Sequence, residues 1–166
     1  MKALILQGSS RNNGDTAKAV QVLAEHNNWE VVHLTDCTIA PYDYEHRHRG
    51  DDFFPLMRRF IEGDYELLCF ATPIYWYSMS GLLKNFLDRI TDLLQIDKNL
   101  GRQLRGRKMA LVSVNHESVC TPHFEQPFVL SAEYLGMQFL GHVHLNMESG
   151  ITSEVTQHLT DFGAVL

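Results

Sequence analysis

Cysteine is scarce in this chain of 166 residues, and no group of residues has the spacing of a metal site. The three cysteines, Cys37, Cys69 and Cys120, are scattered and odd in number, which argues against a disulfide framework and fits a reducing compartment. Nine histidines are present, but none combines with others into the three or four ligands that zinc requires. We therefore expect a cytoplasmic protein without a metal centre.

Long hydrophobic runs and an excess of positive charge are also missing. No apolar stretch approaches the roughly 18 residues that cross a bilayer, and the run at residues 3–6 is too short for a signal-peptide core. The net charge is −6, which argues against a nucleic-acid partner. With 45% hydrophobic and 20% charged residues, the composition is that of a globular protein, and we expect one domain over residues 1–166.

Three common phosphate-binding motifs are absent from the segment Gly8–Thr16, which follows the first apolar run. The segment lacks the lysine of a P-loop and the Gly-x-Gly-x-x-Gly pattern of dinucleotide-binding folds. A tyrosine phosphatase would need a cysteine where Ser9 and Ser10 stand. These absences argue against a P-loop kinase, a dinucleotide-binding Rossmann fold and a phosphatase.

What the chain does have is a regular alternation of short apolar runs with longer helical patterns. This alternation predicts βαβ units, a mainly parallel sheet and helices on both of its faces. Ligands of such sheets bind at the carboxyl ends of the strands. The expected strands are residues 2–6, 30–34, 65–71, 108–114 and 138–145, and the expected helices are residues 15–27, 80–94, 124–135 and 151–165, with a short helix around residues 54–61.

The segment Gly8–Thr16 lies between the first predicted strand and the first predicted helix. Backbone N–H groups of such a loop converge with the positive end of the helix dipole on an anion. Serine and threonine hydroxyls add donors, and Arg11 adds a full positive charge. We expect a phosphate-binding loop; the alternative is a simple turn with a polar helix cap.

A second informative loop follows the third predicted strand, at residues 72–81. It carries three consecutive aromatic residues, Tyr75, Trp76 and Tyr77, which are awkward to bury in a surface loop. Their faces could pack against a planar ligand. A dimer interface would also explain them, and the two interpretations are compatible.

Together, the segments 8–16 and 72–89 resemble the NAD(P)H-dependent FMN reductase family of the flavodoxin-like superfamily. The second segment is the more specific, because Pro73, Tyr75, Trp76 and Ser78 through Gly81 fit the family pattern and are followed by Leu83, Lys84, Phe86, Asp88 and Arg89. The resemblance implies a flavodoxin-like three-layer α/β sandwich. Its five-stranded parallel sheet would have the order 2-1-3-4-5 and would bind FMN without a covalent bond.

The resemblance also implies which residues hold the cofactor. Ser9, Arg11, Asn13 and Thr16 would bind the phosphate. The isoalloxazine ring would be lined by Pro73, Ile74, Tyr75, Trp76 and Ser78, and approached from its far side by Asn115 and His116. His116 could instead contact a substrate.

The implied activity is that of an FMN-dependent NAD(P)H oxidoreductase. A hydride would pass from the nicotinamide through flavin N5 to a quinone, flavin or similar small-molecule acceptor, with no catalytic side chain required. Two alternatives stay open: a flavodoxin-type electron carrier, and a non-enzymatic binding module that has lost FMN. Analogy with members of the family and the exposed aromatic loop suggest a homodimer, with dimer contacts through the helix that carries Asp88 and Arg89.

Several residues depart from the family pattern or invite other interpretations. Asp15 stands where relatives often carry Asn or Ser, and a carboxylate there would oppose a dianionic phosphate. Members with an iron–sulfur cluster have a compact cysteine motif after the second strand, where this chain has only Cys37, so we expect no cluster. The charged stretch at residues 43–52 is interpreted as solvated and mobile, although it could close over the site or reach a neighbouring subunit.

Overall fold

A parallel sheet with helices on both faces forms the centre of the molecule. The computed structural model describes all residues, 1–166. The strands are β1 (Ala3–Gln7), β2 (Glu30–His33), β3 (Leu67–Tyr75), β4 (Ser78–Met79), β5 (Lys108–Asn115) and β6 (Gln138–Asn146). The α-helices are α1 (Asp15–Asn27), α2 (Phe53–Glu62), α3 (Gly81–Gln95), α4 (Lys98–Arg102), α5 (Gln126–Leu135) and α6 (Ser153–Val165), and residues Leu34–Asp36 form a 3-10 turn.

The strand order is β2-β1-β3-β5-β6, and every neighbouring pair on this path is parallel. Because β5 and β6 are the fourth and fifth of the predicted strands, the order predicted by the family resemblance is confirmed. The two-residue strand β4 was not predicted; it returns antiparallel along the end of β3. Helix α4 and the 3-10 turn were also not predicted, because segments of three to five residues show no periodic pattern.

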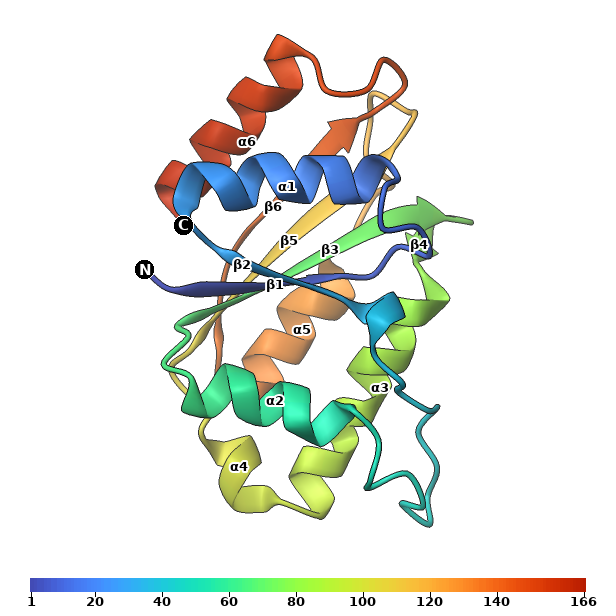
Figure 1. Cartoon of the computed structure of the whole chain (residues 1–166), viewed down its shortest axis with the longest axis vertical. Coiled ribbons are helices and arrows are strands. Elements are labelled where there is room, and N and C mark those ends of the chain that lie inside the picture. Colours follow the sequence, from blue (N-terminus) through green and yellow to red (C-terminus); the bar gives the residue numbers. More distant parts are fainter.

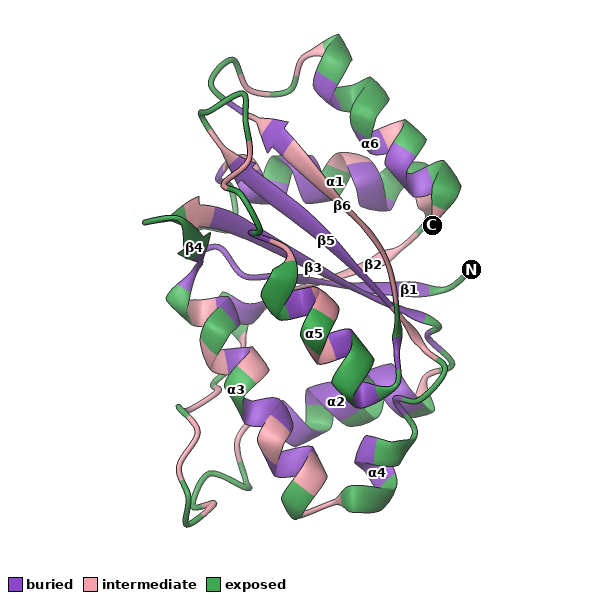
Figure 2. Cartoon of the chain, turned by 180° about the vertical axis from the view of Figure 1, so that it is seen from behind, coloured by how far each residue is buried: buried purple, intermediate pink, exposed green.

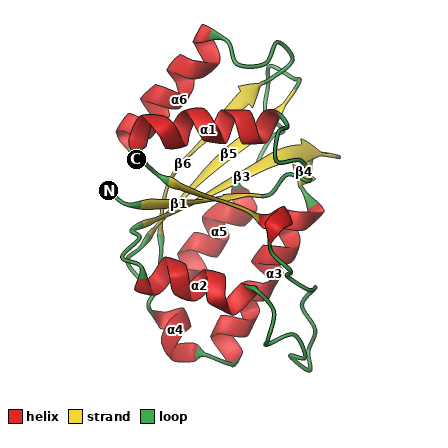
Figure 3. Cartoon of the chain, viewed as in Figure 1, coloured by secondary structure: helices red, strands yellow, loops and turns green.

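Two apolar clusters fill the space on either side of the sheet. Helices α1 and α6 cover one face, and α2, α3 and α5 pack against the other (Figures 1 and 3). The residues of β1, β3 and β5 are buried almost throughout, as expected for strands covered on both faces (Figure 2). None of the helices combines the length and apolar character needed to span a bilayer.

Helix boundaries follow local signals that place the loops of the site. Ser80 caps α3 by accepting a hydrogen bond from the Leu83 N–H at 3.1 Å, and Thr152 caps α6 in the same way. Helix α5 ends at Gly136, whose φ of 70° is the left-handed conformation that glycine adopts freely. In contrast, Gly14 precedes α1 without any side-chain cap, so that end of α1 is left for other partners.

The charged stretch 43–52 is mostly exposed, as predicted, but Asp51 within it is anchored to the fold by a buried arginine. The Arg89 side chain on α3 is only 1% exposed and forms ion pairs with Asp51 and Asp92. It also donates to the carbonyl oxygens of Ala40 at 2.9 Å and His48 at 3.0 Å. Arg89 therefore ties the segment to α3, and its own buried side chain is not available for dimer contacts.

Opposite charges set the ionisation of this buried cluster. Burial alone would lower the pKa of Arg89, but the hydrogen bonds and charges of Asp51 and Asp92 outweigh it and raise that pKa. Burial likewise opposes ionisation of Asp51, yet the bonds from Arg89 and from the Ala40 and Phe53 N–H groups lower the pKa of Asp51. Arg89 and Asp51 are thus held in their charged forms.

Candidate functional site

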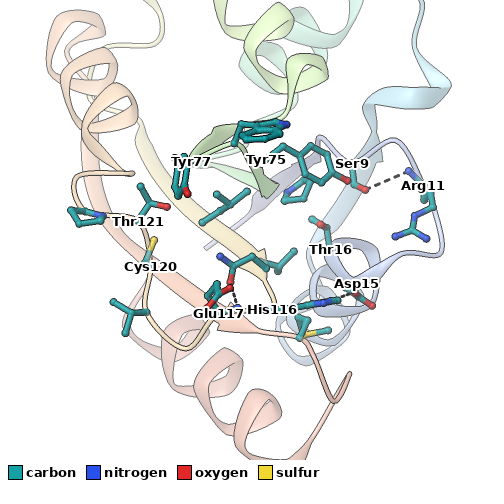
Figure 4. Close-up of a pocket in the computed structure, with 18 residues that line it drawn as sticks. Ser9, Arg11, Asp15, Thr16, Tyr75, Tyr77, His116, Glu117, Cys120 and Thr121 are labelled. Atoms are coloured by element: carbon teal, nitrogen blue, oxygen red, sulfur yellow. Dashed lines mark hydrogen bonds and ion pairs between the residues drawn. The ribbon is translucent and has the colours of Figure 1, made fainter.

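The carboxyl ends of β1, β3, β5 and β6 open into a cleft of about 700 Å³ (Figure 4). This is the edge of the sheet at which ligands of doubly wound folds bind, and the volume suits a small molecule or cofactor. The cleft is lined by Ser9, Arg11, Asp15, Thr16, Pro73, Ile74, Tyr75, Trp76, Tyr77, Val114, Asn115, His116, Glu117, Val119, Cys120, Thr121, Pro122 and Met147.

The first wall is the loop between β1 and α1, and its polar side chains line the cleft. Ser9 is 4% exposed and accepts a hydrogen bond from the Arg11 N–H at 3.4 Å. The Arg11 guanidinium forms no ion pair or side-chain hydrogen bond within the protein, and Thr16 lies in the first turn of α1. An unpaired guanidinium and two hydroxyls beside a helix N-terminus make a site for an anion such as a phosphate.

The second wall is the turn that joins β3 to β4. Tyr75 pairs with Ser78, so the turn consists of Trp76 and Tyr77. Their φ angles are 50° and 65°, the left-handed region in which bulky side chains are rare. Positive φ at both central residues identifies a type I′ hairpin, which is normally built from Asn and Gly. The hairpin presents three aromatic rings at the mouth of the cleft, with Trp76 94% exposed.

These two walls are joined by a short hydrogen-bonded path. The Ser80 hydroxyl donates to the Gly8 carbonyl, and the Ser80 N–H donates to Thr72 Oγ1 at 3.0 Å. A Cβ atom on Gly8 would lie 2.8 Å from Leu83 Cβ, so only glycine allows this close approach. The β1–α1 loop therefore has a fixed position relative to the aromatic hairpin.

The third wall is the loop that follows β5. His144 Nε2 lies 3.2 Å from the Glu117 carbonyl oxygen, which can only accept, so this nitrogen carries the proton. Behind it, the fully buried Ser113 hydroxyl contacts His144 Nδ1 at 2.9 Å and His142 Nε2 at 2.7 Å. The two histidines of β6 are therefore held by a buried serine and support the wall.

Burial controls the ionisable groups behind this wall. The pKa of His142 is lowered from 6.5, mainly by burial and further by His144, against the opposing charge of Glu125. Burial also raises the pKa of the Cys120 thiol, and the hydrogen bond with Ser113 offsets only part of that effect. Both groups are neutral at neutral pH.

Most residues predicted for the site come together in the cleft. Its lining includes Ser9, Arg11, Thr16, Pro73, Ile74, Tyr75, Trp76, Asn115 and His116. Asn13 and Ser78 are exposed and do not line it, because Asn13 lies in the turn before α1 and Ser78 faces outward on β4.

Other lining residues were not predicted. Val119, Cys120, Thr121 and Pro122 extend the wall after β5, and Met147 follows β6. For Val119 through Pro122, the position of a loop after the fourth predicted strand was the only sequence signal. Asp15 lines the cleft as well, and its carboxylate lies 3.2 Å from His116 Nε2.

A family match fits this geometry. The model of the family described as NADPH-dependent FMN reductase matches residues 1–151. The chain belongs to this family. The expected resemblance is thereby confirmed, and the protein is an FMN-dependent NAD(P)H oxidoreductase.

Individual relatives agree with this assignment. The chain is 29% identical over 154 residues to the putative NAD(P)H-dependent FMN-containing oxidoreductase YwqN of Bacillus subtilis, covering 86% of this chain and 83% of the relative. The solved structure of the Trp repressor binding protein from Bacillus subtilis is similar, with a TM-score of 0.74, 22% identity and 95% coverage of both chains.

The fold is also that of a solved FMN complex. The general stress protein 14 of Treponema denticola, in complex with FMN, has a TM-score of 0.66 and 19% identity, with 99% of this chain and 97% of that chain covered. Among the functions considered from sequence, the family supports the enzyme rather than the electron carrier or the module without FMN.

Proposed function

We propose that the cleft binds FMN with its phosphate at the β1–α1 loop and its ring beside the aromatic hairpin. Ser9, Arg11 and Thr16 would hold the phosphate. The ring would lie among Pro73, Ile74, Tyr75, Trp76, Asn115 and His116. Asn13 and Ser78 are left out of this proposal because neither lines the cleft.

The unpaired Arg11 guanidinium is the observation that carries the proposal. Its donors have no acceptor within the protein, and they lie with Ser9 and Thr16 at the uncapped end of α1. A phosphate would supply the missing acceptors and the compensating charge. The residues present thus fit the phosphate end of FMN.

Bound FMN would supply the redox chemistry, accepting a hydride from NAD(P)H and passing two electrons to a quinone, flavin or similar acceptor. The chain would supply binding and orientation. The hairpin rings offer flat apolar faces beside a polar loop, which suits a planar acceptor with polar edges. The hydrogen-bonded path through Ser80 would hold phosphate and ring sites at a fixed separation.

We further propose that the protein is a homodimer with the clefts near the interface. The exposed rings of Trp76 and Tyr77 support this, because aromatic residues are enriched at interfaces. Light scattering at micromolar concentration should give twice the mass of one chain, and a monomer would refute this part of the proposal. The cytoplasmic location and the lack of a nucleic-acid partner stay predictions.

Anaerobic reduction of the purified protein tests the function. The FMN-loaded protein should lose the visible absorption band of oxidised flavin when NADH or NADPH is added, and a quinone added next should restore it. A band that neither nucleotide bleaches would contradict the proposed reaction. Free FMN at the same concentration, without protein, is the matched control.

A further inference from the structure

Three side chains of arginine, aspartate or glutamate line the cleft, and they differ in whether the protein supplies a partner. Asp15 pairs with His116 Nε2 at 3.2 Å and with Lys18 Nζ at 3.6 Å. The Arg11 guanidinium, on the first wall, and the Glu117 carboxylate, on the third, have no partner (Figure 4). Once a phosphate pairs with Arg11, as proposed above, Glu117 carries the unpaired charge that faces a second ligand.

Glu117 combines a fixed backbone with a free side chain. Its N–H donates to Asn115 Oδ1 at 2.8 Å, and its carbonyl oxygen accepts from His144 Nε2 at 3.2 Å. His144 is in turn held by the fully buried Ser113 hydroxyl. The residue is exposed, and its carboxylate forms no ion pair or hydrogen bond within the protein. The carboxylate is therefore placed at the wall of the cleft and is available to a ligand.

The aromatic hairpin is a second feature that responds to the charge of a ligand. Tyr75, Trp76 and Tyr77 are exposed and line the same cleft as Glu117. The faces of such rings attract cations. The cation–π contacts within the protein all involve other rings, so no cation of the chain covers the hairpin. The hairpin and the carboxylate thus favour positive charge on a ligand from two different walls.

We propose that the cleft selects planar electron acceptors by their charge, and that the Glu117 carboxylate sets this selectivity. It attracts cationic acceptors, leaves uncharged ones unaffected and repels anionic ones. The inference deepens the proposed function and rests on it, because it assumes that FMN occupies the cleft with its phosphate at Arg11. Glu117 acts on the charge of the acceptor and takes no part in electron transfer.

Binding of three anthraquinones to the full-length, FMN-loaded protein in its oxidised state tests the proposal. The three ligands carry a trimethylammoniomethyl, a hydroxymethyl or a sulfonate group at the same ring position, so that one is cationic, one uncharged and one anionic. Oxidised flavin cannot reduce a quinone, so isothermal titration calorimetry measures their dissociation constants without turnover. Added salt should weaken binding of the cation and strengthen binding of the sulfonate, because salt screens exposed charges.

Two variants of Glu117 isolate its charge from the size of the substituents. Glu117→Gln should lower the dissociation constant of the sulfonate and raise that of the cation, each about fivefold, the factor for two unit charges about 4 Å apart in water. The constant of the uncharged ligand should stay the same. Glu117→Lys should shift both constants further in the same directions.

Glu133→Gln is the matched control. Glu133 is an exposed glutamate near the end of α5 that forms no ion pair and does not line the cleft. Its replacement makes the same change in net charge and should leave all three constants unchanged. The changes caused by Glu117→Gln should also appear in the rates at which the three quinones reoxidise the reduced protein.

The outcomes separate this inference from the function on which it rests. If Glu117→Gln leaves the constants of the cation and the sulfonate unchanged, or shifts all three alike, the charge selectivity is overturned while the proposed reaction stands. Equal shifts in Glu133→Gln would assign the effect to net charge and overturn the role of Glu117. If the protein retains no FMN, or if no quinone binds or reoxidises it, the proposed function itself fails.

Discussion

The cleft and the segment 37–52 both bring charged and aromatic residues together, yet they are organised in opposite ways. Against the segment 37–52, the buried guanidinium of Arg89 from α3 has an acceptor for each of its nitrogens, and Asp51 accepts from Arg89 and from two backbone N–H groups. In the cleft, the Arg11 guanidinium is unpaired and the aromatic rings are exposed. The difference separates groups that hold the fold together from groups that are available to a ligand.

The two arginines give the sharpest test of this contrast. Arg89→Ala should lower the free energy of unfolding by about 3–5 kcal/mol, because it leaves the buried carboxylates of Asp51 and Asp92 without their partner. Urea unfolding measures the change. The exposed Arg49, whose Nε donates only to the His46 carbonyl, is the matched control, and Arg49→Ala should change stability by less than about 0.5 kcal/mol. A similar loss of unfolding free energy in Arg89→Ala and Arg49→Ala would show that Arg89 contributes no more to stability than an exposed arginine.

Arg11→Ala should show the opposite pattern, with weaker FMN binding and almost unchanged stability. Loss of a charge-assisted hydrogen bond is worth about 1.5–3 kcal/mol, so the dissociation constant should rise by about 10- to 100-fold. Flavin fluorescence measures this at low salt, again with Arg49→Ala as control. An unchanged dissociation constant would show that the phosphate site has been misassigned.

The aromatic hairpin should be stabilised by changes that impair the site. Replacing Trp76 with Asn and Tyr77 with Gly supplies the residues that a type I′ turn favours. Because each left-handed residue costs about 1–2 kcal/mol, we expect the double variant to gain about 1 kcal/mol in urea unfolding and to bind FMN less tightly.

His123→Gly is the matched control for the hairpin. His123 also has a positive φ, 61°, but its side chain does not line the cleft. This variant should gain stability without any change in FMN binding. A hairpin variant that loses stability would indicate that its rings stabilise the fold rather than serve a ligand.

Acid should affect the two regions in different pH ranges, and this is the smallest expected effect. The pKa of His142 behind the cleft is lowered in the folded state, so its contribution to stability is complete above about pH 6.5 and is lost as the pH falls below that value. The pKa of Asp51 is lowered from 3.8, so its contribution is lost only as the pH falls below about 4.

Urea unfolding between pH 7.5 and 5 checks this order. The wild type should lose stability in this range, and His142→Gln should lose less. An equal decline in both proteins would assign the effect to other groups.

The sequence predicted the alternation of strands and helices well because that alternation depends on patterns that extend over many residues, and the family resemblance supplied the strand order. Continuous apolar runs identified β1, β3 and β5, and the segment 8–16 marked the loop that lies beside them. Elements as short as β4 and α4 have no periodic pattern, so they could not be predicted.

Pairing across long sequence distances could not be predicted. The whole charged stretch 43–52 was predicted to be solvated, because nothing in the sequence places Asp51 beside Arg89, 38 residues later. For the same reason, the Asp15–His116 pair was not foreseen, although Asp15 itself was identified as a departure from the family pattern.

A crystal structure of the protein grown with FMN would test the central claim most directly. We expect the phosphate within hydrogen-bonding distance of Ser9, Arg11 and Thr16, and the isoalloxazine ring beside Tyr75 and Trp76. A phosphate that lies away from the end of α1, with Arg11 still unpaired, would contradict the assignment of the site.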